Sequence, residues 1–262
     1  MITVQNPISE DLSAMRHSLL PGLLSAVSLN ASRQQERVAL FELGATYKGK
    51  LPLQEQPREE NHLALVLWGR RHPVNWGVAA EYYDFYDLKG VLEVLLPASK
   101  LDWGQGTSPS FHPGRQGSIS YQGQEIAVYG ELHPQVLRNF KISGRAYAAE
   151  IRFEKILDVF NAVPEFRVLP KYPSVDRDLA VVVDVDQAVG ELLEHLHTLA
   201  GELLQRTTVF DVYAGKPIPE GKKSIAFSLR FQGDRNLRDD EINAIMDKCI
   251  TGLNTQFGAE IR

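Results

Sequence analysis

The feature that most constrains the fold is a strand at residues 224–232 in which apolar and polar side chains alternate strictly. One face carries Ile225, Phe227, Leu229 and Phe231, and the other carries Ser224, Ala226, Ser228, Arg230 and Gln232. A period of two over this length predicts an antiparallel strand with one face on a core and the other in water. The sequence therefore predicts an antiparallel sheet whose second face is open and polar.

A second strand at 207–213 precedes it, and a loop rich in glycine, proline and lysine joins the two. Tyr213 is expected to share the open face with Arg230 and the small polar residues. A flat surface with an aromatic ring, a guanidinium group and hydroxyls suits unstacked RNA bases. An ordinary solvated sheet face has the same composition, so the pattern alone leaves both interpretations open.

The elements around these two strands predict a ferredoxin-like domain. A β-branched strand at 179–183 is followed by an amphipathic helix at 189–196, and a longer helix at 239–257 leads to a short strand near 259–262. Together with the two central strands this order is β-α-β-β-α-β, the split motif of ferredoxin-like folds. Cys249 lies on the apolar stripe of the longer helix and is expected to be inert core.

The first part of the chain predicts a larger antiparallel sheet with flanking helices, so the whole chain is of the α+β class. Helices are expected after Pro21 and at 85–96, and strands at 38–47, 62–69, 117–121, 125–129 and 147–153. Residues 51–61 are polar and are expected to form a loop. A proline-containing linker at 163–170 places the domain boundary between 166 and 167, which gives domains 1–166 and 167–262.

Polar residues of the first domain form no recognisable catalytic motif. His112 and His133 each precede a proline at a strand end, where turn geometry explains them, and Arg115 and Glu131 lie nearby. The sequence contains neither a Walker-type phosphate loop nor a His-Glu-x-x-His helix. We therefore predict no catalytic residue and no metal site in this chain.

Composition narrows the class of protein further. The chain has 262 residues, of which 44% are hydrophobic and 23% charged, and its apolar runs are too short to cross a bilayer. It opens without a leader-like segment and has one cysteine, which excludes an internal disulfide, so we expect a cytoplasmic protein that binds no membrane. Residues 169–262 carry 15 acidic against 11 basic residues, so any RNA contact must depend on a local patch.

Three stretches of the second domain resemble a known family. They are 172–180 (YPSVDRDLA), 210–213 (FDVY) and 219–224 (PEGKKS), and they occur in the same order in the ferredoxin-fold anticodon-binding domain of the bacterial phenylalanyl-tRNA synthetase beta subunit. The first domain resembles the class II synthetase-like domain of that subunit. The stretches that carry this second resemblance are 15–24 (MRHSLLPGLL), 40–44 (LFELG), 85–90 (FYDLKG), 111–115 (FHPGR) and 130–134 (GELHP).

The resemblance implies a part of phenylalanine–tRNA ligase that does not itself catalyse. Aminoacylation in the family belongs to the alpha subunit, and a class II site needs cationic groups against the phosphates of ATP. Here the class signature Gly-x-Gly-x-Glu-Arg is absent, and 147–155 read YAAEIRFEK where it is expected. Lys48-Gly49-Lys50 stands where an active core has an arginine. The first domain is thus expected to be a scaffold for the alpha subunit.

The resemblance also implies partners and cofactors. The intact enzyme is a heterotetramer of two alpha and two beta subunits that uses ATP and magnesium and binds tRNA(Phe), whereas no cofactor is expected in this chain alone. The oligonucleotide-fold and editing domains of the beta subunit have no counterpart here. The chain is therefore expected to be a C-terminal fragment without editing activity.

Carried over residue by residue, the family's anticodon-loop contacts fall first on Tyr213 and Ser224. The Tyr213 ring would stack on a base, the Ser224 hydroxyl would meet a base edge, and Asp211 would accept from guanine N–H groups. Phosphate contacts are expected from Arg230, Lys222 and Lys223. An alternative stays open, because small amino-acid-binding regulatory domains share the ferredoxin-like topology and a fold does not determine function.

Overall fold

The computed structural model describes residues 2–9, 13–49, 56–96, 101–160 and 169–262. The chain divides into two compact units, Met1–Pro164 and Glu165–Arg262. The linker expected at 163–170 and the boundary expected after residue 166 fall almost entirely outside the described residues. Each unit has its own sheet and its own core, and each is described by itself.

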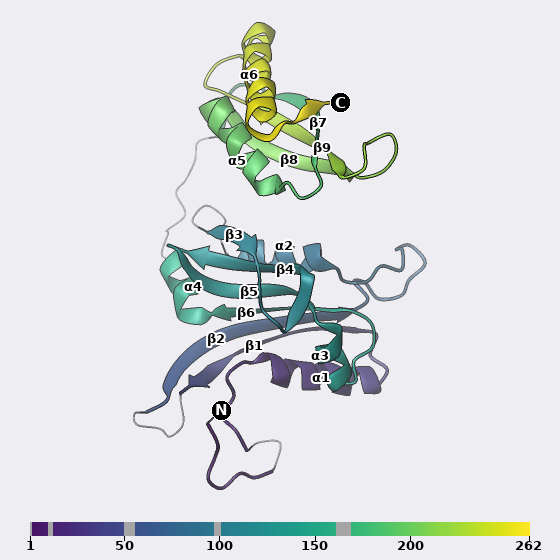
Figure 1. Ribbon diagram of the computed structural model, residues 1–262, viewed down its shortest axis with the longest axis vertical. Helices are drawn as coiled ribbons and strands as arrows, with labels where there is room; N and C mark the ends of the chain where they lie inside the picture. The colour runs from purple at the N-terminus through teal and green to yellow at the C-terminus, as the bar shows by residue number, and fades with distance from the viewer. Residues whose placement is uncertain (1, 10–12, 50–55, 97–100, 161–168) are drawn as a thin grey trace. The chain divides into compact units, whose positions relative to one another are not determined.

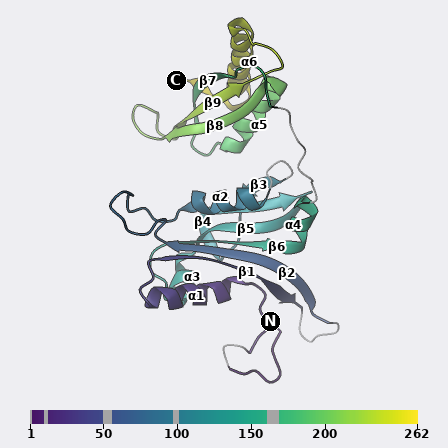
Figure 2. The same cartoon turned by 180° about the vertical axis from the view of Figure 1, so that it is seen from behind.

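The first unit is built on a six-stranded antiparallel sheet with the order β1-β2-β6-β5-β4-β3. Its strands are β1 (Arg37–Lys48), β2 (Arg58–Gly69), β3 (Asp102–Gln105), β4 (Phe111–Tyr121), β5 (Gln124–Leu132) and β6 (Ala146–Arg152). Its helices are α1 (Leu20–Ser32), α2 (Phe85–Leu95), α3 (Pro134–Asn139) and α4 (Phe153–Phe160). Helices α1 and α2 run along opposite faces of the sheet (Figure 1 and, from behind, Figure 2).

Each face of this sheet is covered by its own apolar core. Leu88 and Leu92 of α2 pack with Leu65 and Leu67 on one face. Leucines of α1 pack on the other face with Val66 and with residues that lead into and follow α3. Since every second side chain points to each face, β2 and β6 must be apolar at successive positions, as the sequence predicts for the strand at 62–69.

A largely buried carboxylate anchors the start of α1 to the sheet. Glu150 of β6 accepts hydrogen bonds from the Ser18 hydroxyl at 2.7 Å and from the Leu19 N–H at 2.8 Å, and His62 Nδ1 lies 3.1 Å from it. Burial opposes the charged form, but these hydrogen bonds outweigh it and hold the pKa of Glu150 below its ordinary value. The hydrogen-bond donors at the start of α1 are therefore paired with a carboxylate on the central strand β6.

The second unit is a four-stranded antiparallel sheet of order β10-β7-β9-β8 with two helices on one face. The elements follow as β7 (Val175–Asp184), α5 (Val189–Ala200), β8 (Leu204–Tyr213), β9 (Lys222–Phe231), α6 (Asp239–Phe257) and β10 (Glu260–Ile261). This order confirms the ferredoxin-like β-α-β-β-α-β fold. Acidic residues in the first turn of α6 complement the positive helix end, and Gly258, with φ of 62°, ends it in the left-handed conformation.

The core of the second unit takes only one face of its sheet. Ile225, Phe227, Leu229 and Phe231 of β9 are buried against α5 and α6, as the alternation predicts. Cys249 lies in the same core, where burial raises the pKa of its thiol. Both observations agree with the sequence-based expectations.

Three elements of the first unit differ from the sequence-based expectations, and one of them is β4, which begins at Phe111 and not at residue 117. The strand β3 was not expected, because its four residues include a glycine and carry no apolar alternation; it forms by pairing with β4. Residues 58–61 were expected in a loop but belong to β2, where Lys48 of β1 pairs with Arg58. Cross-strand pairing forms β3 and extends β2 past its apolar segment, since backbone hydrogen bonds do not depend on side-chain polarity.

Among the described residues, none of the helices has both the length and the hydropathy of a membrane span. The same residues contain no group of three His, Cys, Asp or Glu side chains placed to hold a metal ion.

Candidate nucleic-acid interface

Strand register brings the predicted contact residues of the second unit to one open face. Tyr213 pairs directly with Ser224, and Asp211 pairs with Ala226 on the same face. A bulge between Val209 and Asp211 shifts the end of β8 by one residue, and this shift is what turns Asp211 and Tyr213 to the face opposite the core. The long loop that joins the end of β8 to the start of β9 follows directly after Tyr213 (Figure 1).

The Tyr213 ring is held in a fixed orientation by its own loop. Its hydroxyl donates a hydrogen bond to the Lys216 carbonyl oxygen at 2.8 Å. A Cβ added at Gly215 would lie 2.9 Å from that hydroxyl, so the loop backbone closes directly onto the ring. The side chain nevertheless remains 41% exposed. A ring that is oriented before a base arrives loses little conformational freedom when the base stacks on it.

Ser224 is less accessible than the alternation predicts. It lies on the open face but is only 3% exposed. Its small side chain stands between Tyr213 on one neighbouring strand and Val182 on the other. Arg262 Nη1 lies 3.4 Å from its hydroxyl. A short side chain in a central strand is covered by taller neighbours even where no helix lies above it.

Asp211, in contrast, is exposed and available. In the part of the chain that the structure describes, no group donates a hydrogen bond to its carboxylate. An ionised carboxylate accepts several hydrogen bonds at once, and so this side chain can receive the paired N–H groups of a guanine edge. It lies two residues from Tyr213 on the same strand face.

The three cations expected to contact phosphates are all engaged within the protein. Arg230 makes a two-point ion pair with Asp176, both contacts at 2.8 Å, and the hydrogen bond lowers the pKa of Asp176. Lys222 lies 3.2 Å from Glu260. Lys223 donates to the Gln187 carbonyl oxygen at 2.7 Å. A phosphate at these positions would have to replace an internal partner.

Lys222 and Lys223 also differ in the face that they occupy. Lys223 pairs with Val183, whose side chain is in the core, and it therefore belongs to the helix-covered side of the sheet. Lys222 shares the open face with Ser224. The sequence-based prediction gave both lysines the same phosphate-binding role, but the strand register places them on opposite faces of the sheet.

The structure adds Arg262 to the open face, a residue that the sequence analysis assigned no role. Its backbone N–H donates to Ala180 at 3.0 Å, and its guanidinium lies 6.0 Å from the centre of the Tyr213 ring. This distance is within the range of a cation–π contact. The sequence signal was only the last short strand, because the contact joins residues about fifty positions apart.

Polar residues at the strand ends of the first unit have structural partners. Arg115 and Glu131 form an ion pair at 3.0 Å. His112 Nδ1 accepts from the Gly114 N–H, and His133 Nδ1 accepts from the Gln135 N–H at the start of α3. Turn and cap geometry thus accounts for both histidines, as the sequence indicates.

Two family models together match most of this chain. The one described as "Phenylalanyl tRNA synthetase beta chain CLM domain" matches residues 1–153, and the one described as "Ferredoxin-fold anticodon binding domain" matches residues 170–262. The chain belongs to the phenylalanyl-tRNA synthetase beta-chain family. The family resemblance seen in the sequence is thereby confirmed.

Curated relatives agree with the beta-chain family. The phenylalanine–tRNA ligase beta subunit of Mannheimia succiniciproducens is 38% identical over 262 residues, which cover 98% of this chain and 33% of the relative. That of Moorella thermoacetica is 39% identical over 267 residues, which cover all of this chain and 33% of the relative. The chain thus spans about a third of the length of these relatives.

Proposed function

We propose that this chain is part of the beta subunit of a phenylalanine–tRNA ligase, in which the first unit supports the catalytic alpha subunit and the second contacts the anticodon loop of tRNA(Phe). The observation that carries the RNA contact is the pairing of an oriented aromatic ring, Tyr213, with an exposed and unengaged carboxylate, Asp211, on one open face. ATP and magnesium serve the alpha subunit, and the enzyme works in the cytoplasm.

At this face, stacking provides affinity and base-edge contacts provide specificity. The Tyr213 ring stacks on a base, which is worth about 1–3 kcal/mol and is tolerant of sequence. Asp211 supplies specificity by accepting from a guanine edge, and Ser224 contributes through its hydroxyl at the base of the site. Arg262, Arg230 and Lys222 contribute positive charge, with Arg262 nearest the ring. Lys223 lies on the helix-covered side of the sheet and makes no contact at this face.

The open face has only a few basic residues, which is consistent with the excess of acidic residues in the second unit. Because Arg230 and Lys222 already hold carboxylates, a phosphate gains little over the internal partner, and affinity depends mainly on the stacked base. This arrangement suits a module that reads one loop while the rest of an assembly holds the tRNA.

The edge strand of the first unit supports the scaffold role. Phe41 and Leu43 of β1 are 75% and 53% exposed, on the sheet face that Leu65 shares in the core. Edge strands with exposed apolar side chains are suited to pairing or packing with another chain. Lys48, which stands where an active core has an arginine, is ion-paired with Glu60 at 2.7 Å. The isolated chain should therefore support no pyrophosphate exchange with phenylalanine and ATP.

The test is binding of a tRNA(Phe) anticodon stem-loop to the whole chain, followed by fluorescence anisotropy. Tyr213→Ala should weaken binding about tenfold or more, from the stacking energy of one base. Asp211→Asn should reduce the preference for guanine at the stacked position. Cys249→Ser is the matched control, since this core residue cannot touch RNA. Equal binding by the parent chain, Tyr213→Ala and Ser224→Ala would show that the face is merely solvated.

The alternative of an amino-acid-binding regulatory module has weaker support. A cavity of about 440 Å³ lies between α5 and α6, and it is lined by Glu191, Glu194, His195, Thr198, Gln256 and Phe257. No lysine or arginine is among these lining residues, so an amino-acid carboxylate would meet two acidic side chains there. A thermal shift with phenylalanine that is lost in His195→Ala, together with no shift from the stem-loop, would reverse this preference.

A further inference from the structure

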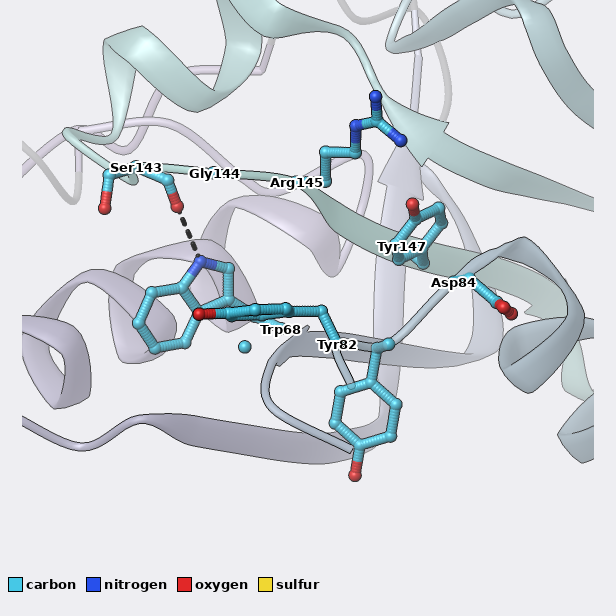
Figure 3. A pocket seen from close by; sticks show the side chains of 9 residues that line it. Trp68, Tyr82, Asp84, Ser143, Gly144, Arg145 and Tyr147 are labelled. Carbon is cyan, nitrogen blue, oxygen red and sulfur yellow. Dashed lines mark hydrogen bonds between the residues drawn. The ribbon is translucent and has the colours of Figure 1, made fainter. Parts of the chain in front are cut away.

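A cavity of about 520 Å³ lies in the first unit, beside the start of α2, where β2 ends and β6 begins. Figure 3 shows Trp68 on one side of it and Asp84 and Arg145 on the other. Both charged groups have partners inside the protein. Asp84 is bound by Arg71 at 3.0 Å, and Arg145 lies 3.8 Å from Glu131. A charged ligand in this cavity would have to displace an internal partner, whereas the second unit carries an unpaired cation on its surface.

This unpaired cation is Arg206, near the start of β8 and far from the loop that follows Tyr213 (Figure 1). The strand register places it directly opposite Arg230 of β9, so that both side chains lie on the open face of the sheet. Arg206 is exposed. Like charges that stand directly opposite each other on two strands destabilise a sheet. The arrangement therefore costs stability unless other groups compensate for it.

Only one of these two guanidinium groups is neutralised. Asp176 of β7 accepts from Arg230 through both of its oxygens, at 2.8 Å each. Across the ranges that the structure describes, no hydrogen bond or ion pair engages the Arg206 guanidinium. Asp178, another carboxylate of the open face, stands opposite Ser228 on β7, and β7 is two strand spacings, or about 10 Å, from β8. Arg206 thus presents an uncompensated positive charge to solvent.

The groups around Arg206 are of the kinds that contact a sugar–phosphate backbone. Thr208 pairs with Ser228 on the same open face. The Gln232 amide donates to the Tyr172 carbonyl oxygen at 2.7 Å, which brings the segment before β7 to this end of the sheet. Tyr172 is 38% exposed, and Lys171 beside it is exposed as well. Arginine, lysine, hydroxyl and amide side chains supply most protein contacts to phosphate and sugar oxygens.

This end of the open face is well separated from the stacking ring. Ser224, which pairs with Tyr213, precedes Arg230, which pairs with Arg206, by 6 residues on β9. At about 3.3 Å per residue the two ends are about 20 Å apart. A nucleic-acid strand with stacked bases carries one phosphate per about 3.4 Å. One nucleotide cannot reach both ends, but a base and a more distant phosphate of the same RNA can.

We propose that Arg206 binds a backbone phosphate of the RNA whose base stacks on Tyr213. This proposal rests on the RNA contact proposed above and extends it from the loop end of the open face to the opposite end. The Arg206 guanidinium donates two parallel hydrogen bonds to the phosphate oxygens, while Arg230 stays paired with Asp176. Because the contact is to phosphate, it orients the RNA along the strands and adds affinity without reading sequence.

Anisotropy titrations of a tRNA(Phe) anticodon stem-loop with the whole chain, at several salt concentrations, test the proposal. Arg206→Met should weaken binding about two- to fivefold at low salt, the range for one exposed ion pair. The slope of log affinity against log salt should become shallower by about 0.7–0.9, the contribution of one phosphate. Arg206→Lys keeps the charge and should keep the slope. Arg177→Met is the matched control, since Arg177 pairs with Leu229 on the core side of the sheet and binds Asp239.

A second measurement identifies the phosphate. Stem-loops in which one phosphate at a time is replaced by a neutral methylphosphonate should include a position that weakens binding to the parent but causes no further loss in Arg206→Met. Equal further losses in both proteins at every position would exclude a direct phosphate contact. If Tyr213→Ala weakens binding but Arg206→Met changes neither affinity nor salt slope, this proposal is wrong and the stacking site stands. If the parent does not bind the stem-loop, both proposals are wrong.

Discussion

The two sheets of this chain differ in how many faces they bury. In the first unit Ala148 and Ala149 are neighbours on β6, point to opposite faces and are both fully buried, one in each core. In the second unit Phe227 is fully buried, whereas Arg230 on the other face of the same strand is exposed. A sheet covered on both faces can carry functional groups only at strand ends and edges, and a sheet covered on one face offers a whole surface.

The location of polar groups follows this difference. Apart from Glu150 and His62, which anchor α1, polar groups of the first unit lie at strand ends, in ion pairs such as Arg115–Glu131, and in the cavity beside α2. In the second unit they lie along the strands, from Arg230 to Tyr213. The first arrangement suits a scaffold with enclosed sites, and the second suits contact with an extended partner such as a nucleic-acid loop.

The largest expected effect is on stability, and it compares a residue on the core face of the second sheet with one on its open face. Phe227→Ala removes a fully buried ring and should destabilise the unit by about 3–5 kcal/mol. Ser228→Ala, one residue along and on the open face, should change stability by no more than about 0.5 kcal/mol. Urea unfolding followed by circular dichroism measures both. Similar losses for the two variants would mean that the open face is covered.

The next effect concerns the buried carboxylate that anchors α1. Glu150→Gln should destabilise the first unit at pH 7 by about 1–3 kcal/mol, because three hydrogen-bond partners lose a charged acceptor. Because the pKa of Glu150 is lowered in the folded protein, the unfolded chain takes up this proton first as the pH falls. The advantage of the parent is therefore complete above the ordinary pKa of 4.5 and shrinks below it. Unfolding curves should therefore show a smaller difference in the free energy of unfolding between the parent and Glu150→Gln at low pH than at pH 7.

A smaller effect distinguishes the Tyr213 ring from its hydroxyl. Tyr213→Phe keeps the stacking surface but removes the hydrogen bond to Lys216, which should cost about 0.5–1.5 kcal/mol of loop order. Stem-loop binding should fall less than in Tyr213→Ala. Equal losses in the two variants would assign the contribution to the loop and not to stacking. Anisotropy titrations at one fixed salt concentration make the comparison.

The smallest effect is expected at Arg230. Its ion pair with Asp176 is exposed, so Arg230→Met should leave the unfolding midpoint nearly unchanged. Stem-loop binding should weaken slightly for every loop sequence, with a shallower salt dependence. A change in which loop is preferred would instead make Arg230 a base contact.

Local sequence pattern was sufficient for most of the second unit. The helix at 239–257 and the alternation of β9 were predicted from side chains that repeat with the helical and strand periods, because those periods are set by local backbone geometry. Cys249 was placed in the core by the same rule. The short strand β3 was not predicted, since its formation depends on a partner strand and not on its own four residues.

The candidate sites were predicted less completely than the elements. Tyr213 and Asp211 could be assigned to one face from their spacing. The burial of Ser224, the internal partners of Lys222 and Arg230 and the position of Arg262 beside the Tyr213 ring could not, since each depends on a residue at least thirty-eight positions away. The cavity in the first unit likewise joins the end of β2 to the start of β6 and of α2.

The sequence by itself determined the α+β class, the ferredoxin-like order of elements, the family and the choice of open face, because periodicity and short motifs are local properties. Tertiary structure alone decided which open-face side chains are accessible, which charges are neutralised and where a cavity forms. Those properties depend on distances between segments that are far apart in the chain, and local backbone preferences do not encode such distances.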